Sequence, residues 1–398
     1  MLTGKTIILC VTGGIAAYKA VELLRLLTKA GADVHVIMTR SAQEFVTPLT
    51  FQTLSHNPVH TEIFNLIAER EIGHISLADQ ADLFIIAPAT ANIIGKLACG
   101  IADDMLTTTA MATKAPVLVA PAMNVNMYRN SIYLENEERL RRHGYFFVDA
   151  VKGELACGWE GEGKLQTPEV IFEEAVKALT PPDLAGERVL ITAGPTREEI
   201  DPVRYISNYS SGKMGFAIAR AAWRRGAQVT LVSGPTCLPA PWGVVIVAVE
   251  SADEMYQAVM ERGKESSVII KAAAVADYRP LARAGEKLKK QGDIMTLELV
   301  KNRDILTELG KEKGTRLLVG FAAETTDLLT NALKKLRDKN VDLLVANDVT
   351  EAGAGFSVDT NIVRLLHRDG RVDEPGLLSK DAVANLILDR VAELQGIR

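Results

Sequence analysis

Short apolar runs that alternate with helical stretches limit what this chain can fold into. The runs are TIILCVT, DVHVIMT, DLFIIAP, PVLVAP and YFFVDA in the first half, and RVLITAG, QVTLVSG, SVIIKAAA, RLLVGFAA and DLLVAND in the second. Strands that are apolar on both faces belong in parallel sheets that helices cover on both sides. The pattern therefore predicts an α/β protein with doubly wound, Rossmann-like parallel sheets.

The length and an internal echo indicate two such domains. The chain has 398 residues, more than one hydrophobic core usually serves. GGIAAYKAVELLRLLTKAGADVHVIMT and SSGKMGFAIARAAWRRGAQVTLVSG both run from a small-residue turn through a helix and a Gly-Ala pair into a strand. The segment ALTPPDLAGER separates the two series. We expect domains at 1–180 and 188–398, joined by a linker at 181–187, each with a ligand crevice where its strands end.

Composition excludes several classes of function. The formal net charge is −5 and the basic residues form no long block, which argues against a protein that binds nucleic acid or a membrane surface. The N-terminus lacks the pattern of a secretory signal, and no apolar run reaches about 18 residues. The four cysteines form no C-x-x-C and the six histidines no H-E-x-x-H. We expect a cytoplasmic enzyme or binding module that acts on small molecules.

Small and hydroxyl-bearing residues follow the strands of the first half. After the first strand, Thr12-Gly13-Gly14 opens a helix whose unpaired N–H groups can face an anion. No G-x-G-x-x-G is present, so we expect a mononucleotide rather than a dinucleotide. The alternative is that the hydroxyls are ordinary helix N-caps. The candidate cofactor residues are Gly13, Gly14, Thr39, Ser41, Pro88, Thr90, Asn92 and Met123.

Three further segments carry candidate chemistry. In VLVAPAMNVNMY a buried strand ends so that Asn124 can present its amide to a ligand. In KGELACGWEGEGKL, Cys157 lies among glycines typical of a mobile flap, and GHISLADQAD holds His74. The alternatives are a histidine at a helix start, an asparagine cap and a buried small thiol.

The P-A-M-N-x-x-M element, the His74 segment and the LACG flap resemble the flavin-containing cysteine decarboxylases that bind FMN. The resemblance implies a flavodoxin-like first domain. A cysteine carboxylate cannot simply lose CO₂, because the carbanion has no electron sink; a flavin supplies one by oxidising the thiol. By similarity, His74 assists oxidation and decarboxylation, Asn124 binds the departing carboxylate and Cys157 donates a proton. Lys164 stands where the family commonly has arginine, and its role is open.

The second half carries a different set of motifs. RYISNYSSGKMG holds Arg204 and Asn208 before a helix entered through serines and a glycine, without a Walker motif. AAAVADY ends a strand with alanines, against which a ring could lie, followed by Asp277, an acid suited to Mg²⁺. A basic loop with Lys287 follows and could offset triphosphate charge. The alternative for this loop is a solvated surface segment.

These motifs and GFAAET resemble phosphopantothenate-cysteine ligases of the bacterial CTP-dependent type, and the whole chain resembles the bifunctional family of coenzyme A biosynthesis that joins both activities. The resemblance implies that a carboxylate is activated by CTP as an acyl-cytidylate, which the cysteine amine then attacks. Asn208 and Arg204 would handle this carboxylate, Lys287 the phosphoryl charge and Asp277 Mg²⁺ or Mn²⁺. The implied CTP contacts are Ala273, Asp277, Lys287, Arg303, Asp304, Ile305, Leu306, Phe321, Lys335 and Lys339.

The same resemblance implies partners. They are the substrates 4′-phosphopantothenate, cysteine and CTP, and further copies of the chain, with decarboxylase trimers, ligase dimers and a dodecamer as the candidate assembly. At Arg303 the family often has proline, so we expect backbone contacts there. Two rivals remain. A flavoprotein reductase with an NAD(P)H domain is disfavoured by the missing G-x-G-x-x-G, and a non-catalytic regulatory flavoprotein by the intact His74, Asn124 and Cys157.

Overall fold

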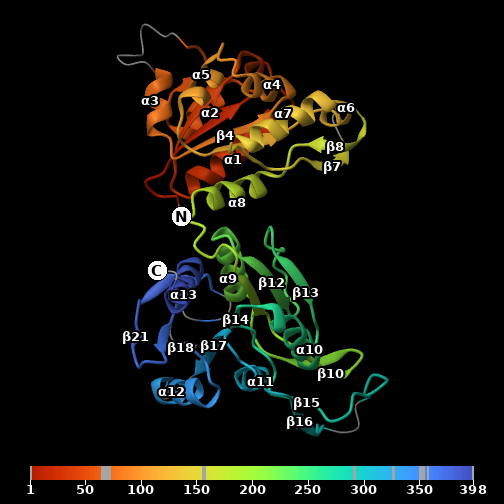
Figure 1. Cartoon of the computed structure of the whole chain (residues 1–398). Coiled ribbons are helices and arrows are strands. Elements are labelled where there is room, and N and C mark those ends of the chain that lie inside the picture. Colours follow the sequence, from red (N-terminus) through yellow and green to blue (C-terminus); the bar gives the residue numbers. More distant parts are fainter. Residues whose placement is uncertain are drawn as a thin grey trace. The chain divides into compact units, whose positions relative to one another are not determined.

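The computed structural model describes residues 2–63, 73–154, 158–289, 293–324, 328–348, 355 and 358–396. The chain divides into two compact units, Met1–Thr180 and Pro181–Arg398. Each unit has its own sheet, with helices against it (Figure 1). No helix in the described ranges is long and apolar enough to cross a membrane.

The first unit is built on a six-stranded parallel sheet with the order β3-β2-β1-β4-β5-β6. Its strands are β1 Thr6–Val11, β2 Asp33–Met38, β3 Val59–His60, β4 Leu83–Ala89, β5 Val117–Pro121 and β6 Phe146–Phe147. The chain moves outward from β1 to β3 and then returns to the other side of β1. This reversal confirms the predicted doubly wound fold and opens a crevice between the carboxyl ends of β1 and β4.

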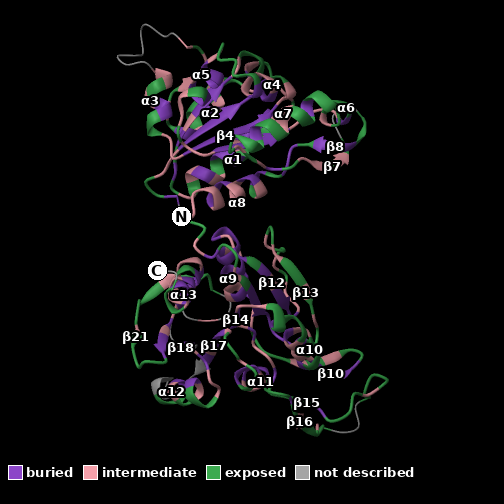
Figure 2. Cartoon of the chain, in the orientation of Figure 1, coloured by how far each residue is buried: buried purple, intermediate pink, exposed green. Residues whose placement is uncertain are grey.

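Helices cover both faces of this sheet and create two cores. Successive residues of β1 alternate between them: Ile7 and Leu9 pack in one cluster, Ile8 and Cys10 in the other. Figure 2 shows the buried strands between partly exposed helices. The helices are α1 Ala17–Lys29, α2 Pro48–Ser55, α3 Gly73–Gln80, α4 Ala91–Cys99, α5 Met105–Ala112, α6 Val125–Tyr128, α7 Ser131–Arg142 and α8 Pro168–Ala178, with a 3₁₀ turn at Arg40–Glu44.

The second unit repeats this layout and extends it. Its eight-stranded sheet has the order β13-β12-β9-β14-β17-β18-β20-β21, with the reversal between β9 and β14. The strands are β9 Arg188–Ala193, β12 Gln228–Ser233, β13 Val245–Ala248, β14 Val268–Lys271, β17 Leu317–Glu324, β18 Leu343–Asp348, β20 Arg364–His367 and β21 Val372–Asp373. The strands from β13 to β18 are parallel.

The last two strands differ from the predicted parallel arrangement, because β20 and β21 are antiparallel to their neighbours. A tight turn joins them: His367 N–H donates to the Arg371 carbonyl at 2.9 Å, and Gly370 adopts a φ of 92°. A connection this short cannot carry the crossover that parallel strands need. The apolar pattern of RLLH was therefore compatible with either direction.

Helices and small hairpins complete the second unit. Buried residues of α9 and α13 share one core with the sheet, and those of α10 and α11 share another. The helices are α9 Lys213–Arg224, α10 Ala252–Arg262, α11 Ile305–Lys311, α12 Leu328–Asp338 and α13 Lys380–Leu394, with a 3₁₀ turn at Gly263–Glu265. Two-stranded antiparallel sheets pair β10 Arg197–Asp201 with β11 Arg204–Ser207, β15 Tyr278–Pro280 with β16 Leu299–Lys301, and β19 Thr360–Ile362 with β22 Leu377–Ser379.

Two residues of the expected linker pack in the second unit. Leu184 is fully buried in its core. Asp183 accepts two hydrogen bonds from Arg225, at 2.8 and 2.7 Å, and Arg225 also bonds Asp389 of α13 at 3.0 Å. The side chain of Arg225 is only 3% exposed. This buried network ties the start of the unit to its C-terminal helix.

Replacement of Arg225 by methionine should destabilise the second unit by about 3 kcal/mol, because it removes a buried guanidinium that bonds two part-buried carboxylates. Urea unfolding followed by tryptophan fluorescence in a Trp159→Phe background reports this unit, since Trp223 and Trp242 both lie in it. Arg368→Met, which removes an exposed charge, is the control and should cost less than about 1 kcal/mol. Equal midpoints for the two variants would show that the network is not stabilising.

Candidate active sites

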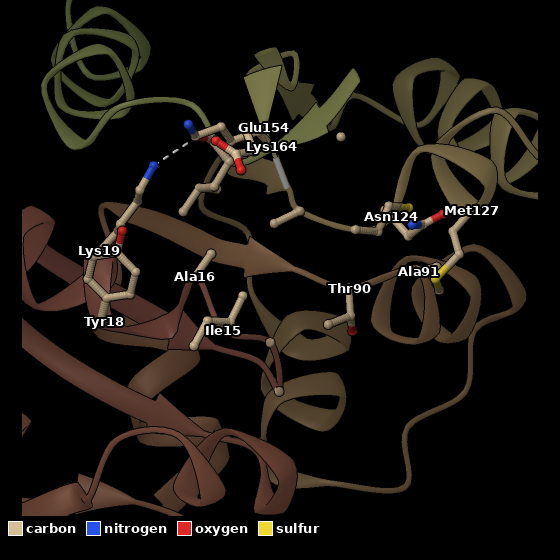
Figure 3. Close-up of a pocket in the computed structure, with 16 residues that line it drawn as sticks. Ile15, Ala16, Tyr18, Lys19, Thr90, Ala91, Asn124, Met127, Glu154 and Lys164 are labelled. Carbon is tan, nitrogen blue, oxygen red and sulfur yellow. Dashed lines mark hydrogen bonds between the residues drawn. The ribbon is translucent and has the colours of Figure 1, made fainter. Parts of the chain in front are cut away.

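Each unit has a cavity at the carboxyl edge of its sheet. In the first unit a cavity of about 570 Å³ lies where β1, β4 and β5 end (Figure 3). Its lining includes five predicted residues: Gly13, Gly14, Thr90, Met123 and Asn124. The predicted residues Thr39, Ser41, Pro88 and Asn92 do not line the cavity in the described structure.

The turn after β1 leaves the start of α1 open to this cavity. The N-cap residue Ala16 has no side-chain oxygen with which to cap the helix. Gly13 is required by its packing, because a Cβ there would lie 2.3 Å from the Cβ of Ser41. Ser41 therefore supports the turn from behind. Amide groups of an uncapped helix start at a cavity fit a phosphate group, as an FMN site requires.

A buried hydroxyl that was not predicted joins two strand ends beneath the cavity. Thr12 Oγ1 donates to the Pro88 carbonyl at 2.6 Å and accepts from the Thr90 N–H at 3.1 Å. Pro88 thus contributes through its backbone. The Thr39 and Thr90 hydroxyls accept from the N–H groups of Ala42 and Ile93, as the N-cap alternative expects. A hydroxyl that accepts from a backbone N–H can still donate its own proton to a ligand.

Asn124 lies where β5 leads into α6. Its Oδ1 accepts from the Asn126 N–H at 2.8 Å, so the amide nitrogen is the end of this side chain that can donate to a ligand in the cavity. The loop is held by a hairpin of β7 Val151–Glu154 and β8 Glu160–Lys164. Met123 N–H donates to the Gly163 carbonyl at 2.9 Å. A Cβ at Gly163, whose φ is 124°, would lie 2.4 Å from the Met123 carbonyl oxygen, so this contact requires glycine.

Two predicted catalytic residues of the first unit are not placed at the cavity. Cys157 lies outside the described residues. His74 is the second residue of α3 and does not line the cavity. Its Nδ1 is buried and has no hydrogen-bond partner among the described residues. A buried ring nitrogen without a partner is unusual in a folded protein.

In the second unit a cavity of about 400 Å³ lies at the carboxyl ends of β14 and β17 and the start of α9. The predicted residues in its lining are Asn208, Ala273, Asp277, Phe321 and Lys335. Asn208 Nδ2 donates to the Ala274 carbonyl at 3.0 Å, which fixes its amide beside the alanine run. The N-cap residue of α9, Gly212, offers no side-chain cap. The arrangement again suits an anionic ligand.

Arg204 and Lys287 lie outside the described lining of this cavity. Arg204 Nη2 bonds Asp201 Oδ2 at 2.6 Å and the Leu288 carbonyl at 2.9 Å. Hydrogen bonds from Arg204 hold the pKa of Asp201 down at about 2, so the pair is charged at neutral pH. Leu288 N–H also donates to Asp201, at 3.2 Å. Arg204 therefore anchors the basic loop that carries the exposed Lys287.

The side chains of the 303–306 turn do not line the second cavity in the described structure; they cap a helix and pack in the core. Asp304 N-caps α11 and pairs with Lys339. Burial alone would raise the pKa of Asp304, but its bonds from Lys339 and the Thr307 N–H outweigh burial and lower it. The Arg303 guanidinium lies 4.9 Å from the ring centroid of Tyr256. Ile305 and Leu306 are buried in the core, so only their backbone could contact a ligand.

Lys271 lines the second cavity and was missed by the sequence analysis. Burial, and next the charge of Lys335, lower its pKa to about 8. Lys335 itself donates to the Phe321 carbonyl at 3.0 Å. The available signal was a lysine at the end of an otherwise apolar strand, in SVIIKAAA. Two neighbouring ammonium groups in a cavity favour a ligand with several negative charges.

Comparison with known proteins also divides the chain into two parts, close to the boundary between the two units. Residues 1–180 match a family model described as Flavoprotein, and residues 184–394 match one described as the DNA/pantothenate metabolism flavoprotein C-terminal domain. The chain is 52% identical over 398 residues to the coenzyme A biosynthesis bifunctional protein CoaBC of Bacillus subtilis (strain 168), covering 99% of this chain and 98% of that one. Its identity to CoaBC of Escherichia coli (strain K12) is 48% over 395 residues, covering 98% and 97%.

Among solved structures, the C-terminal domain of a coenzyme A biosynthesis bifunctional protein CoaBC is 46% identical. The match covers 55% of this chain and 100% of that domain, with a TM-score of 0.47.

Lys271 should make the binding of a polyphosphate to the second cavity depend on pH. Its ammonium form attracts phosphates, and bound phosphates would raise its pKa, so CTP affinity should fall as pH rises through about 8. Calorimetric titration with CTP at pH 7, 8 and 9 measures this fall, by up to about tenfold between 8 and 9. Lys271→Met should bind CTP more weakly at pH 7 and show a flatter profile. Lys311→Met changes an exposed lysine and is the control; an unaltered profile in Lys271→Met would contradict the assignment.

Proposed function

The chain belongs to the CoaBC family of bifunctional coenzyme A biosynthesis proteins, and we propose that its two cavities catalyse consecutive reactions. The second unit joins 4′-phosphopantothenate to cysteine at the cost of CTP. The first unit, a flavoprotein unit, decarboxylates the resulting 4′-phosphopantothenoylcysteine to 4′-phosphopantetheine. The observation that carries this proposal is 52% identity to a CoaBC relative over nearly the full length of both chains, together with a separate cavity at the strand ends of each matched half.

In the ligase reaction, a carboxylate oxygen of phosphopantothenate attacks the α-phosphorus of CTP and pyrophosphate leaves. The cysteine amine then attacks the acyl carbon, and CMP leaves. The uncapped start of α9 and the ammonium groups of Lys271 and Lys335 supply positive charge for the phosphates, and Asn208 presents its amide to the acyl group. The anchor between Arg204 and Asp201 positions the loop from which Lys287 adds to this charge.

Mg²⁺ is proposed to enter the ligase site with the nucleotide. Among the described residues no group of three or more His, Cys, Asp or Glu side chains could hold a metal. Asp277 in the cavity lining offers one carboxylate. Mg²⁺ is commonly bound by one or two carboxylates together with substrate phosphates, and a single acid fits that mode.

In the decarboxylase reaction, FMN is the proposed cofactor and supplies the electron sink by oxidising the substrate thiol. The open start of α1 would hold its phosphate, with Thr90 on the cavity floor. Asn124 donates its amide N–H to the substrate carboxylate and orients it for loss as CO₂. Cys157 is proposed to return a proton in the final reduction. His74 lies off the cavity of one chain, which supports the proposal that flavin sites form between subunits. Decarboxylase trimers and ligase dimers are the proposed assemblies.

Variants should separate the two activities. Purified protein given CTP, Mg²⁺, 4′-phosphopantothenate and cysteine should release pyrophosphate and CO₂. Asn208→Ala should lower pyrophosphate release about 100-fold, because it removes a cavity hydrogen-bond donor, and should still decarboxylate supplied intermediate. Asn124→Ala should do the reverse. A parallel loss of both activities in each variant would argue against separate sites, and NADH oxidation without CTP would favour a flavoprotein reductase.

Cys157→Ser should stop the reaction after decarboxylation. A hydroxyl is a much weaker acid than a thiol, so the last proton transfer should fail while flavin absorbance and CO₂ release persist. Mass spectrometry should then detect an oxidised product, two hydrogens lighter than 4′-phosphopantetheine. Cys99→Ser, at an exposed cysteine, is the matched control. Normal 4′-phosphopantetheine output from Cys157→Ser would contradict the assigned role.

A further inference from the structure

The cavity of the first unit has two chemically different ends. Asn124 and Met127 lie at one side of the close-up, and Tyr18 and Lys19 lie at the opposite side, with Thr90 between them (Figure 3). Lys164 comes from β8 and lines the same cavity on the lysine side. The proposed carboxylate site at Asn124 is therefore separated from a second, basic region.

The two lysines approach each other from different elements. Lys19 Nζ, on α1, donates to the carbonyl of Leu165 at 3.3 Å, the residue next to Lys164 in the chain. Burial, and next the charge of Lys164, lower the pKa of Lys19. Among the described residues, no carboxylate lies within ion-pair distance of either ammonium group. Two close cations without a paired anion make a region that a dianionic ligand would stabilise.

The position of Lys164 is set by the hairpin that also holds the Asn124 loop. Its side chain runs over Gly153 of β7, where a Cβ would lie 3.3 Å from Lys164 Cδ and 3.5 Å from Nζ. The preceding residue, Gly163, bonds the Met123 N–H. One strand thus connects the lysine at one end of the cavity to the loop with Asn124 at the other. The separation of the two ends is part of the fold.

The proposed substrate has matching charges. Its cysteine end carries a carboxylate and its far end a phosphomonoester, which bears about −1.5 to −2 charges at pH 7. The uncapped start of α1, at Gly14–Ala16, already offers a separate place for a cofactor phosphate. Glu154 lines the cavity near Lys164, and the charges of Glu22 and Glu169 also act on Lys19, so both ammonium groups are needed to offset the carboxylates around this end.

Resting on the proposed decarboxylase function, we propose that Lys19 and Lys164 form a subsite for a phosphomonoester, the phosphate of the substrate arm. The subsite selects the phosphorylated substrate and fixes its register, so that the carboxylate reaches Asn124.

The test uses the full-length flavin-loaded protein and a pair of substrates, 4′-phosphopantothenoylcysteine and pantothenoylcysteine. Lys19→Met and Lys164→Gln should each raise KM for the phosphorylated substrate by ~10-fold or more, because each removes a charge-assisted contact. The ratio of kcat/KM between the two substrates should fall towards one. Glu154→Gln should shift the ratio the other way, by about twofold. Lys29→Met on α1 and Lys152→Gln on β7 are matched controls at exposed lysines.

A second readout is independent of catalysis. Calorimetry should show that 4′-phosphopantetheine binds the wild-type protein more tightly than pantetheine and that the variants lose this difference. An unchanged substrate ratio in both lysine variants would overturn the proposal. If the variants instead lose flavin on titration while the ratio stays constant, the lysines bind the cofactor phosphate and the proposal is wrong. Absence of decarboxylation of either substrate by the wild-type protein would refute the proposed function instead.

Discussion

Both units depend on a buried threonine hydroxyl that joins the first strand to the strand across the point where the sheet order reverses. In the first unit, Thr12 accepts from the N–H of Thr90 after β4. In the second, Thr192 accepts from the N–H of Ala273 after β14, at 3.0 Å. Parallel strands diverge at this point because their connections leave in opposite directions. The hydroxyl satisfies an N–H that the ladder no longer reaches, and so holds the floor of each cavity in place.

The sequence predicted the strands that helices cover on both faces of a sheet. It missed the strands that are exposed on one face. Every apolar run identified in the sequence lies in a strand of the main sheets, because such runs have few other stable environments. The β7–β8 hairpin is polar and glycine-containing and the β10–β11 hairpin is polar, so neither has the continuous apolar run of a core strand. Strand direction at β20 and β21 was likewise hidden, since an apolar run does not encode which way it points.

The candidate sites divide along the same line. Asn124 follows the parallel strand β5 and lines the first cavity, as parallel topology requires. Asn208 also lines a cavity, but it follows β11 of the antiparallel β10–β11 hairpin. Several carboxylates precede Arg204 in the sequence, and any of them could pair with its guanidinium. Only the structure shows that Asp201 does so. Lys271 escaped notice because a lysine at the end of an apolar strand is ordinarily taken for a strand boundary. In both units, positive groups that face a cavity lower the stability of the free protein, a cost that an anionic ligand removes on binding.

The contact between Arg204 and the basic loop lowers the conformational entropy of that loop before any ligand binds. Leu288 is fastened through both its carbonyl and its N–H to the Arg204 and Asp201 pair. Lys287 is one residue away, so its Cα lies about 3.8 Å from an anchored position. A loop fixed at this point has already lost much of the entropy of closing over a ligand. The ammonium of Lys287 is thereby confined to a small volume, which raises its effective concentration wherever that volume overlaps a bound polyphosphate, without any new contact in the resting protein.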